Sequence, residues 1–158
     1  MLFRSSDNKW RAALTRFAPL ILWIGVIFLL SSPEASMART SGLLSPILHY
    51  LWPNISPDTD YFVNLAVRKL AHFTVYAILA ILAARSFALS RATNLFRFRY
   101  IFPLVLALLV ASLDELNQSM EPSRTGLFSD VILDFVSACV MTAILWLTGR
   151  PRPPVAEG

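Results

Sequence analysis

The chain has 158 residues, of which 56% are hydrophobic and 15% are charged. Soluble domains usually carry about 45–50% apolar and about 25% charged residues, so this composition argues against an ordinary soluble domain. The net charge of +4 does not indicate a nucleic-acid-binding protein, because the basic residues form separate clusters between hydrophobic runs. The composition therefore predicts an integral membrane protein.

Four segments approach the length of about 20 apolar residues that a membrane-spanning helix needs. None of them alternates with period two over a long stretch, which disfavours a transmembrane β-barrel. The expected fold class is all-α: a polytopic membrane protein with a four-transmembrane-helix bundle that forms one domain over residues 1–148. We expect a disordered, Pro-rich cytoplasmic tail over 149–158 and spans at about 12–30, 66–89, 98–118 and 130–148.

The first hydrophobic segment has a second interpretation as a cleavable signal peptide. It has a basic start, an apolar stretch and a small-residue site at Ser36-Met37-Ala38. Its loss would leave the orientation of the other three helices unchanged.

The long loop after the first span contains apolar residues at helical spacing. This pattern predicts a short interfacial helix that lies on the outer leaflet, or a loop helix packed on the bundle. The residues that define its apolar face are Leu43, Leu44, Ile47, Leu48, Leu51 and Trp52.

Lys and Arg are distributed unevenly among the segments that connect the spans. The N-terminal segment, the loop between the second and third spans and the C-terminal tail are basic, whereas the other two loops carry acids. By the positive-inside rule, both termini and the middle loop lie in the cytoplasm. The basic residues of these segments are Arg4, Lys9, Arg11, Arg16, Arg85, Arg91, Arg97, Arg99, Arg150 and Arg152.

Polar residues gather where the second and fourth spans begin and where the third ends, all at the outer face in this orientation. Ionisable groups inside a membrane are costly and are tolerated when they pair with one another. Lys69 and His72 share a helical face that Tyr76 continues, and Asp134 lies one turn inside Asp130. The third span adds Asp114, Glu115, Asn117 and Gln118, and the following loop adds Arg124. For Arg68 and Glu121 a simple interfacial role is favoured.

Three stretches, FLLSSPEA, RKLAHFTVYAILA and DELNQSMEPSRTGLFSDVILD, resemble the VanZ-like family of bacterial membrane proteins. The family pattern has K-x-x-H-F with a following Tyr, then D-E-x-x-Q, R-x-G and D-x-x-x-D. One departure is Ser137-Ala138, where the family often has a glycine that favours close helix packing. The resemblance implies a multi-pass protein of the bacterial inner membrane and a link to low-level resistance against teicoplanin-type glycopeptide antibiotics.

Three hypotheses for function follow, and the residues alone leave the choice open. The first is an outward-facing site that binds or modifies the headgroup of an envelope lipid, a lipid-linked cell-wall precursor or a lipoglycopeptide. The second is a membrane-embedded enzyme acting on a phospholipid headgroup, with His72 as general base and Mg²⁺ or Ca²⁺ on paired acids. The third is a structural scaffold without a ligand. The candidate catalytic residues are His72, Asp114 and Glu115, and the candidate ligand-binding residues are Lys69, Tyr76, Gln118, Arg124, Asp130 and Asp134.

Overall fold

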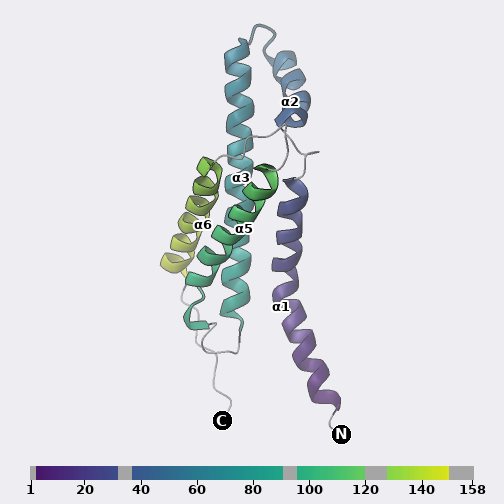
Figure 1. Cartoon of the computed structure of the whole chain (residues 1–158), viewed down its shortest axis with the longest axis vertical. Coiled ribbons are helices and arrows are strands. Elements are labelled where there is room, and N and C mark those ends of the chain that lie inside the picture. Colours follow the sequence, from purple (N-terminus) through teal and green to yellow (C-terminus); the bar gives the residue numbers. More distant parts are fainter. Residues whose placement is uncertain (1–2, 32–36, 91–95, 120–127, 150–158) are drawn as a thin grey trace.

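The computed structural model describes residues 3–31, 37–90, 96–119 and 128–149, and within these ranges it contains helices and no strand. Four of these helices are long and apolar enough to cross a membrane, which confirms the all-α, four-span fold class. The N-terminal end of α1, the start of α5 and the ends of α3 and α6 lie at the same end of the bundle (Figure 1). The helices are α1 (Phe3–Leu30), α2 (Met37–Leu51), α3 (Pro57–Ala88), α5 (Ile101–Ser119) and α6 (Phe128–Thr148).

Helix α3 begins earlier than the hydropathy of the sequence indicates. Ser56 caps it by accepting a hydrogen bond from the backbone N–H of Thr59 at 3.2 Å, and Pro57 occupies the first turn. Hydropathy placed the start of this span near Ala66, because the first turns are too polar to register as lipid-facing. With 32 residues the helix is about 48 Å long, which exceeds the about 30 Å of the hydrocarbon core, and it extends beyond its neighbours (Figure 1).

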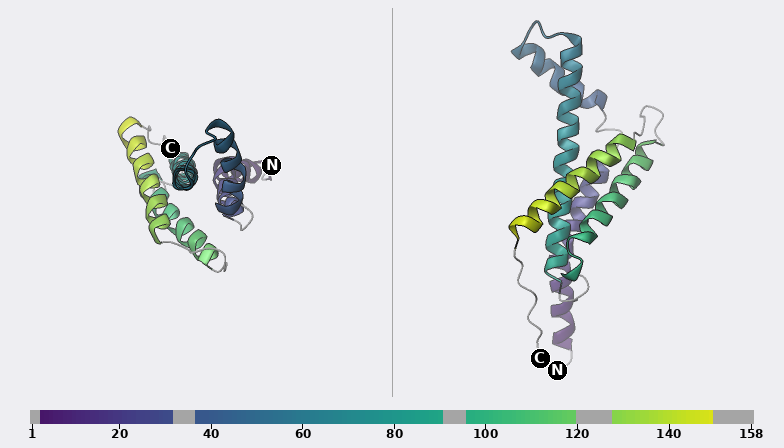
Figure 2. Two further views of the ribbon diagram at one scale, coloured as in Figure 1. Left: turned by 90° about the horizontal axis from the view of Figure 1, so that it is seen from above. Right: turned by 90° about the vertical axis from the view of Figure 1, so that its left-hand side faces the viewer.

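Helix α2 is the predicted outer-loop helix, and it packs beside the protruding part of α3 (Figure 2). The Ser45 hydroxyl donates to Oδ2 of Asp60 at 2.8 Å, and the Asn64 amide donates to the Ser45 hydroxyl at 3.1 Å. Leu48 is buried in this contact, whereas Leu43 and Tyr50 stay exposed. One face of α2 therefore packs on α3 through both polar and apolar contacts, and the opposite face is exposed.

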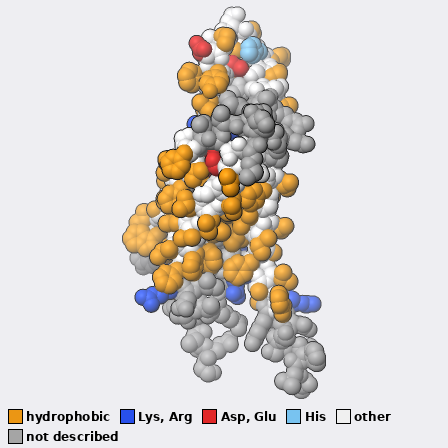
Figure 3. Space-filling view, in the orientation of Figure 1, with side chains coloured by type: hydrophobic (Ala, Val, Ile, Leu, Met, Phe, Trp, Pro, Cys, Tyr) orange, Lys and Arg blue, Asp and Glu red, His pale blue; other side chains and the backbone are white. Residues whose placement is uncertain are grey.

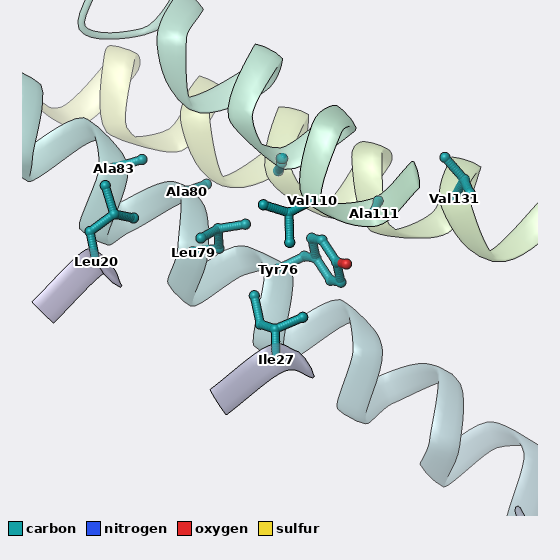
Figure 4. Close-up of a cluster of buried hydrophobic side chains, with 11 residues drawn as sticks. Leu20, Ile27, Tyr76, Leu79, Ala80, Ala83, Val110, Ala111 and Val131 are labelled. Atoms are coloured by element: carbon teal, nitrogen blue, oxygen red, sulfur yellow. The ribbon is translucent and has the colours of Figure 1, made fainter. Parts of the chain in front are cut away.

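Small residues let α3, α5 and α6 approach closely. Alanines from all three helices are almost completely buried around Tyr76 and Leu79 (Figure 4), as small residues in membrane helix interfaces commonly are. Ser137 and Ala138 are fully buried, and the Ser137 hydroxyl donates to the backbone carbonyl of Phe73. The two helices thus pack closely at the position where the expected family glycine is missing.

Helix α1 is attached mainly to α3. The indole Nε1 of Trp23 donates to the carbonyl of Val75 at 3.0 Å, and the Ser86 hydroxyl donates to the carbonyl of Arg16 at 2.9 Å. These two bonds lie three turns apart along α3, so they fix the position of α1 at two levels.

The surface of the bundle is apolar where lipid would surround it. Large hydrophobic side chains project outward from each spanning helix, and they cover the middle of the face shown in Figure 3. Arginines lie at one end of the bundle, below this apolar zone. We call it the basic end, and its described arginines are Arg11, Arg16, Arg85, Arg97 and Arg99.

Candidate functional site

The opposite end of the bundle carries two acid–base pairs between α3 and α6. We call it the polar end, defined by Lys69, His72, Asp114, Asp130 and Asp134. Lys69 Nζ lies 3.1 Å from Oδ1 of Asp130. One turn deeper, His72 Nδ1 lies 3.4 Å from Oδ1 of Asp134. Because α3 and α6 run in the same direction through this end, residues spaced by three on α3 meet residues spaced by four on α6.

The two pairs differ in burial. The side chains of Lys69 and Asp130 are 44% and 21% exposed, whereas those of His72 and Asp134 are 19% and 3% exposed. A carboxylate at the depth of Asp134 is costly without a partner, so contact with the imidazole is what makes its position tolerable.

Asp114 connects α5 to the end of α1. Its Oδ2 accepts hydrogen bonds from the Ser31 hydroxyl at 2.7 Å and from the Gln118 amide at 3.0 Å. The side chains of all three residues are buried. The Ser31 bond joins residues 83 positions apart in the chain, so Asp114 both closes the polar end and fixes the last turn of α1.

A pocket of about 190 Å³ lies between α1, α3 and α5 at this end. Part of its lining is apolar, with Ile27 and Leu30 from α1 and Val67 and Val75 from α3. The polar part of the lining comes from α3, α5 and the end of α1. Its polar side chains are Ser31, Arg68, His72, Tyr76, Asp114 and Gln118.

Tyr76 forms the floor of this pocket. The side chain is 1% exposed, and its hydroxyl has no hydrogen-bond partner among the described residues. The ring packs between the three helices and the hydroxyl points out of the cluster of apolar side chains (Figure 4). A buried hydroxyl without a partner is unfavourable by about 1–3 kcal/mol, so an acceptor or donor brought by a ligand would be stabilised there.

Two residues of the pocket received no ligand role from the sequence. Arg68 was assigned to the membrane interface, yet it is partly buried and lines the pocket with no ion pair to a described residue. Ser31 lies in the FLLSSPEA stretch, and no role was predicted for it. Its position directly after an apolar span could have indicated a polar contact at this end of the bundle.

The remaining candidates contribute less to this pocket. Glu115 is partly buried on α5 but does not line the pocket, because adjacent residues on a helix face different directions. Lys69 and Asp130 lie beside the pocket as an ion pair. Arg124 and Glu121 fall outside the described residues.

The described part of the chain contains no preformed cluster of metal-ligating side chains. No group of three His, Cys, Asp or Glu side chains there is arranged to hold an ion. The three aspartates instead accept hydrogen bonds or contact a base from the protein itself. A role for Mg²⁺ or Ca²⁺ therefore stays a prediction.

Comparison with known proteins gives one result. A family model described as VanZ/LLP1 matches residues 17–149, which include three of the four spans, most of the first (Trp10–Leu30) and every residue of the polar pocket. No curated protein and no solved structure matches the chain.

Proposed function

The chain belongs to the VanZ/LLP1 family, and we propose that its polar pocket binds the phosphate-bearing headgroup of an envelope lipid or of a lipid-linked cell-wall precursor. The observation that carries this proposal is Arg68, a pocket-lining guanidinium that pairs with no described carboxylate. The planar guanidinium fork suits phosphate oxygens, which it can bind with two parallel hydrogen bonds.

The remaining groups of the pocket support the same ligand class. His72 and the hydroxyl of Tyr76 can donate hydrogen bonds to headgroup oxygens, and Asp114 and Gln118 can accept or donate bonds to sugar hydroxyls or amines. The apolar lining residues Ile27, Leu30 and Val67 suit the first carbons of a lipid chain. A pocket lined by both apolar and polar side chains fits an amphiphile better than a water-soluble metabolite.

Orientation is part of this proposal. The basic end faces the cytoplasm by the positive-inside rule, so the pocket faces the outer side of a bacterial inner membrane. That is the side on which glycopeptide antibiotics meet cell-wall precursors. In the cell, binding of such a ligand in the pocket would contribute to resistance against teicoplanin-type antibiotics.

Lipid binding by the purified protein tests the proposal. A fluorescent polyprenyl-phosphate lipid is titrated into the protein in detergent, with Arg68→Gln as the variant and Arg11→Gln as the matched control from the basic end. We expect Arg68→Gln to weaken binding by about tenfold or more, which corresponds to about 1.4 kcal/mol, and Arg11→Gln to bind as wild type. Equal affinity of all three proteins would reject Arg68 as the headgroup ligand.

Growth of a deletion strain on a panel of envelope-targeting antibiotics tests the cellular role. Complementation is compared for the wild type, His72→Ala and His49→Ala, because His49 is exposed on α2 and its ring hydrogen-bonds the carbonyl of Ser45 within the same helix. We expect His72→Ala to lose more of the phenotype than is explained by any fall in its abundance from the loss of the His72–Asp134 contact, and His49→Ala to retain it. A loss that merely follows lower abundance would favour the scaffold hypothesis.

The His72–Asp134 pair favours an enzyme as the second candidate. A carboxylate beside Nδ1 orients a histidine for general-base chemistry, and His72 lines the pocket. In this alternative His72 would take the proton from the water or hydroxyl that attacks phosphorus, the P–O bond to the leaving oxygen would break, and the imidazolium would return the proton to that oxygen. Turnover of a radiolabelled phospholipid or lipid-linked precursor, with and without added Mg²⁺ or Ca²⁺, separates this enzyme from a binding protein.

A further inference from the structure

A second pocket, of about 360 Å³, lies at the basic end between the last turns of α3, the start of α5 and the end of α6. It shares no lining residue with the polar pocket. Its lining combines two arginines with a tyrosine and an apolar floor of Ile81, Ala84 and Leu145.

Arg99 is held in place by its own surroundings. Its guanidinium lies 4.3 Å from the ring centre of Phe96 and 4.6 Å from that of Tyr100, and Nη1 donates to the carbonyl of Phe96 at 3.0 Å. The Nε atom is buried and has no hydrogen-bond partner among the described residues. A fixed guanidinium with an unused donor loses little rotamer entropy when an acceptor arrives.

Arg85 adds a second positive charge in the last turn of α3. Its side chain is exposed and makes no hydrogen bond or ion pair with a described residue. No Asp or Glu lines the pocket, so the two arginines have no negative partner there from the described part of the protein.

The two large apolar side chains of the pocket lie deeper in the bundle than its arginines. Ile81 precedes Arg85 by one helical turn, and Leu145 precedes Gly149 by one turn, so the apolar residues lie nearer the middle of the bundle. The arginines and Tyr100 lie nearer its end. An anionic headgroup at the mouth with acyl chains running inward along Ile81 and Leu145 matches this order, whereas free phosphate would use only the mouth.

From this juxtaposition we propose that Arg85, Arg99 and Tyr100 form a binding site for the phosphate of an anionic phospholipid in the leaflet at the basic end. Basic pockets between membrane helices commonly hold such headgroups. The site would seat the ends of α3 and α6 on the lipid surface, independently of any ligand at the polar end.

Binding of short-chain fluorescent phosphatidylglycerol to the full-length protein in detergent tests the site. The assay uses an Arg68→Gln background, so the polar pocket does not contribute its arginine and the outcome does not depend on the proposed function. The variant is Arg85→Gln with Arg99→Gln, and the matched control is Arg11→Gln with Arg97→Gln, which removes the same charge from the same end. We expect the first pair to weaken binding at least about tenfold and the control pair to change it less than about twofold.

Equal weakening by both pairs would overturn the proposal, because it would show attraction to net charge alone. Displacement of the lipid by inorganic phosphate as effectively as by unlabelled phosphatidylglycerol would also overturn it, because it would show a phosphate site that ignores the acyl chains. Arg85→Gln alone provides the measurement if the double variant does not fold, since this exposed side chain holds no described contact. We expect it to weaken binding about threefold or more while the circular dichroism spectrum stays that of the wild type.

Discussion

Charged side chains at the two ends of the bundle differ in whether they have partners from the protein itself. At the polar end, each of the three aspartates on α5 and α6 contacts a donor or base from the protein, and two of these contacts join α3 to α6. At the basic end, Arg85 and Arg99 have no carboxylate beside them in their pocket. The charged groups of the polar end thus connect helices, whereas the arginines of the basic end have no acidic partner among the residues that line their pocket.

The comparison also separates stability from binding. Removing a buried partner at the polar end leaves an uncompensated group in a poorly solvated place and should cost folding free energy. Removing an exposed arginine at the rim, such as Arg85 or Arg97, should cost almost none. The free energy of unfolding of each variant is measured on the purified protein in mixed micelles by chemical denaturation, unless stated otherwise.

The largest effect is expected for Asp134→Ala. Its side chain is 3% exposed beside His72, so the substitution breaks a buried contact between α3 and α6 and should destabilise the protein by about 3–5 kcal/mol. Asp58→Ala, in the first turn of α3 and exposed, is the matched control. Equal effects of the two substitutions would show that the α3–α6 contact does not hold the bundle together.

A smaller loss is expected for Asp114→Ala. The substitution leaves the donors of Ser31 and Gln118 without their acceptor, which should cost about 2 kcal/mol. Because Ser31 ends α1, proteolysis after this helix should also become faster in the variant. Unchanged stability and unchanged proteolysis would contradict the role of Asp114 in fixing α1.

Lys69→Ala should cost less than about 1 kcal/mol. The pair with Asp130 is 44% and 21% exposed, and exposed ion pairs contribute little. A double-mutant cycle with Asp130→Ala gives the coupling energy directly. A coupling energy as large as that measured in the same way for His72 and Asp134 would show that the deeper position of the second pair does not strengthen it.

The smallest effect is expected for Arg97→Gln at the basic end. Its side chain is exposed, with its guanidinium 5.8 Å from the ring centre of Phe98, so stability should change by less than about 0.5 kcal/mol. The measurement is made in micelles without anionic lipid. A loss of several kcal/mol would mean that this rim is built into the fold.

The spans and the gathering of polar residues were predictable, because hydropathy and charge asymmetry depend on one segment at a time. Lys69 and His72 were placed on one face of α3, and Asp130 and Asp134 on one face of α6, from helical periodicity alone. Their pairing was not predictable, since it depends on how far each helix is rotated about its own axis.

Other features depended on local chemistry that the sequence contains but hydropathy does not show. The Ser56-Pro57-Asp58 stretch starts α3 about two turns before its apolar part. The position of Arg68 in the pocket depends on α1, which packs against α3 through Trp23 and Ser86. From the sequence alone Arg68 is therefore predicted to be an interfacial residue, because the packing of α1 against α3 is not evident there.

The convergence of α3 and α6 at the polar end can be measured directly by cysteine cross-linking in membranes. The native Cys139 is replaced by Ser, and His72→Cys is combined with Asp134→Cys or, as a control, with Trp146→Cys, about 18 Å further along α6. A short bis-thiol reagent should cross-link the first pair efficiently and leave the control pair unlinked. Failure of the first pair to react in folded protein, or equal reaction of both pairs, would contradict the shared polar site.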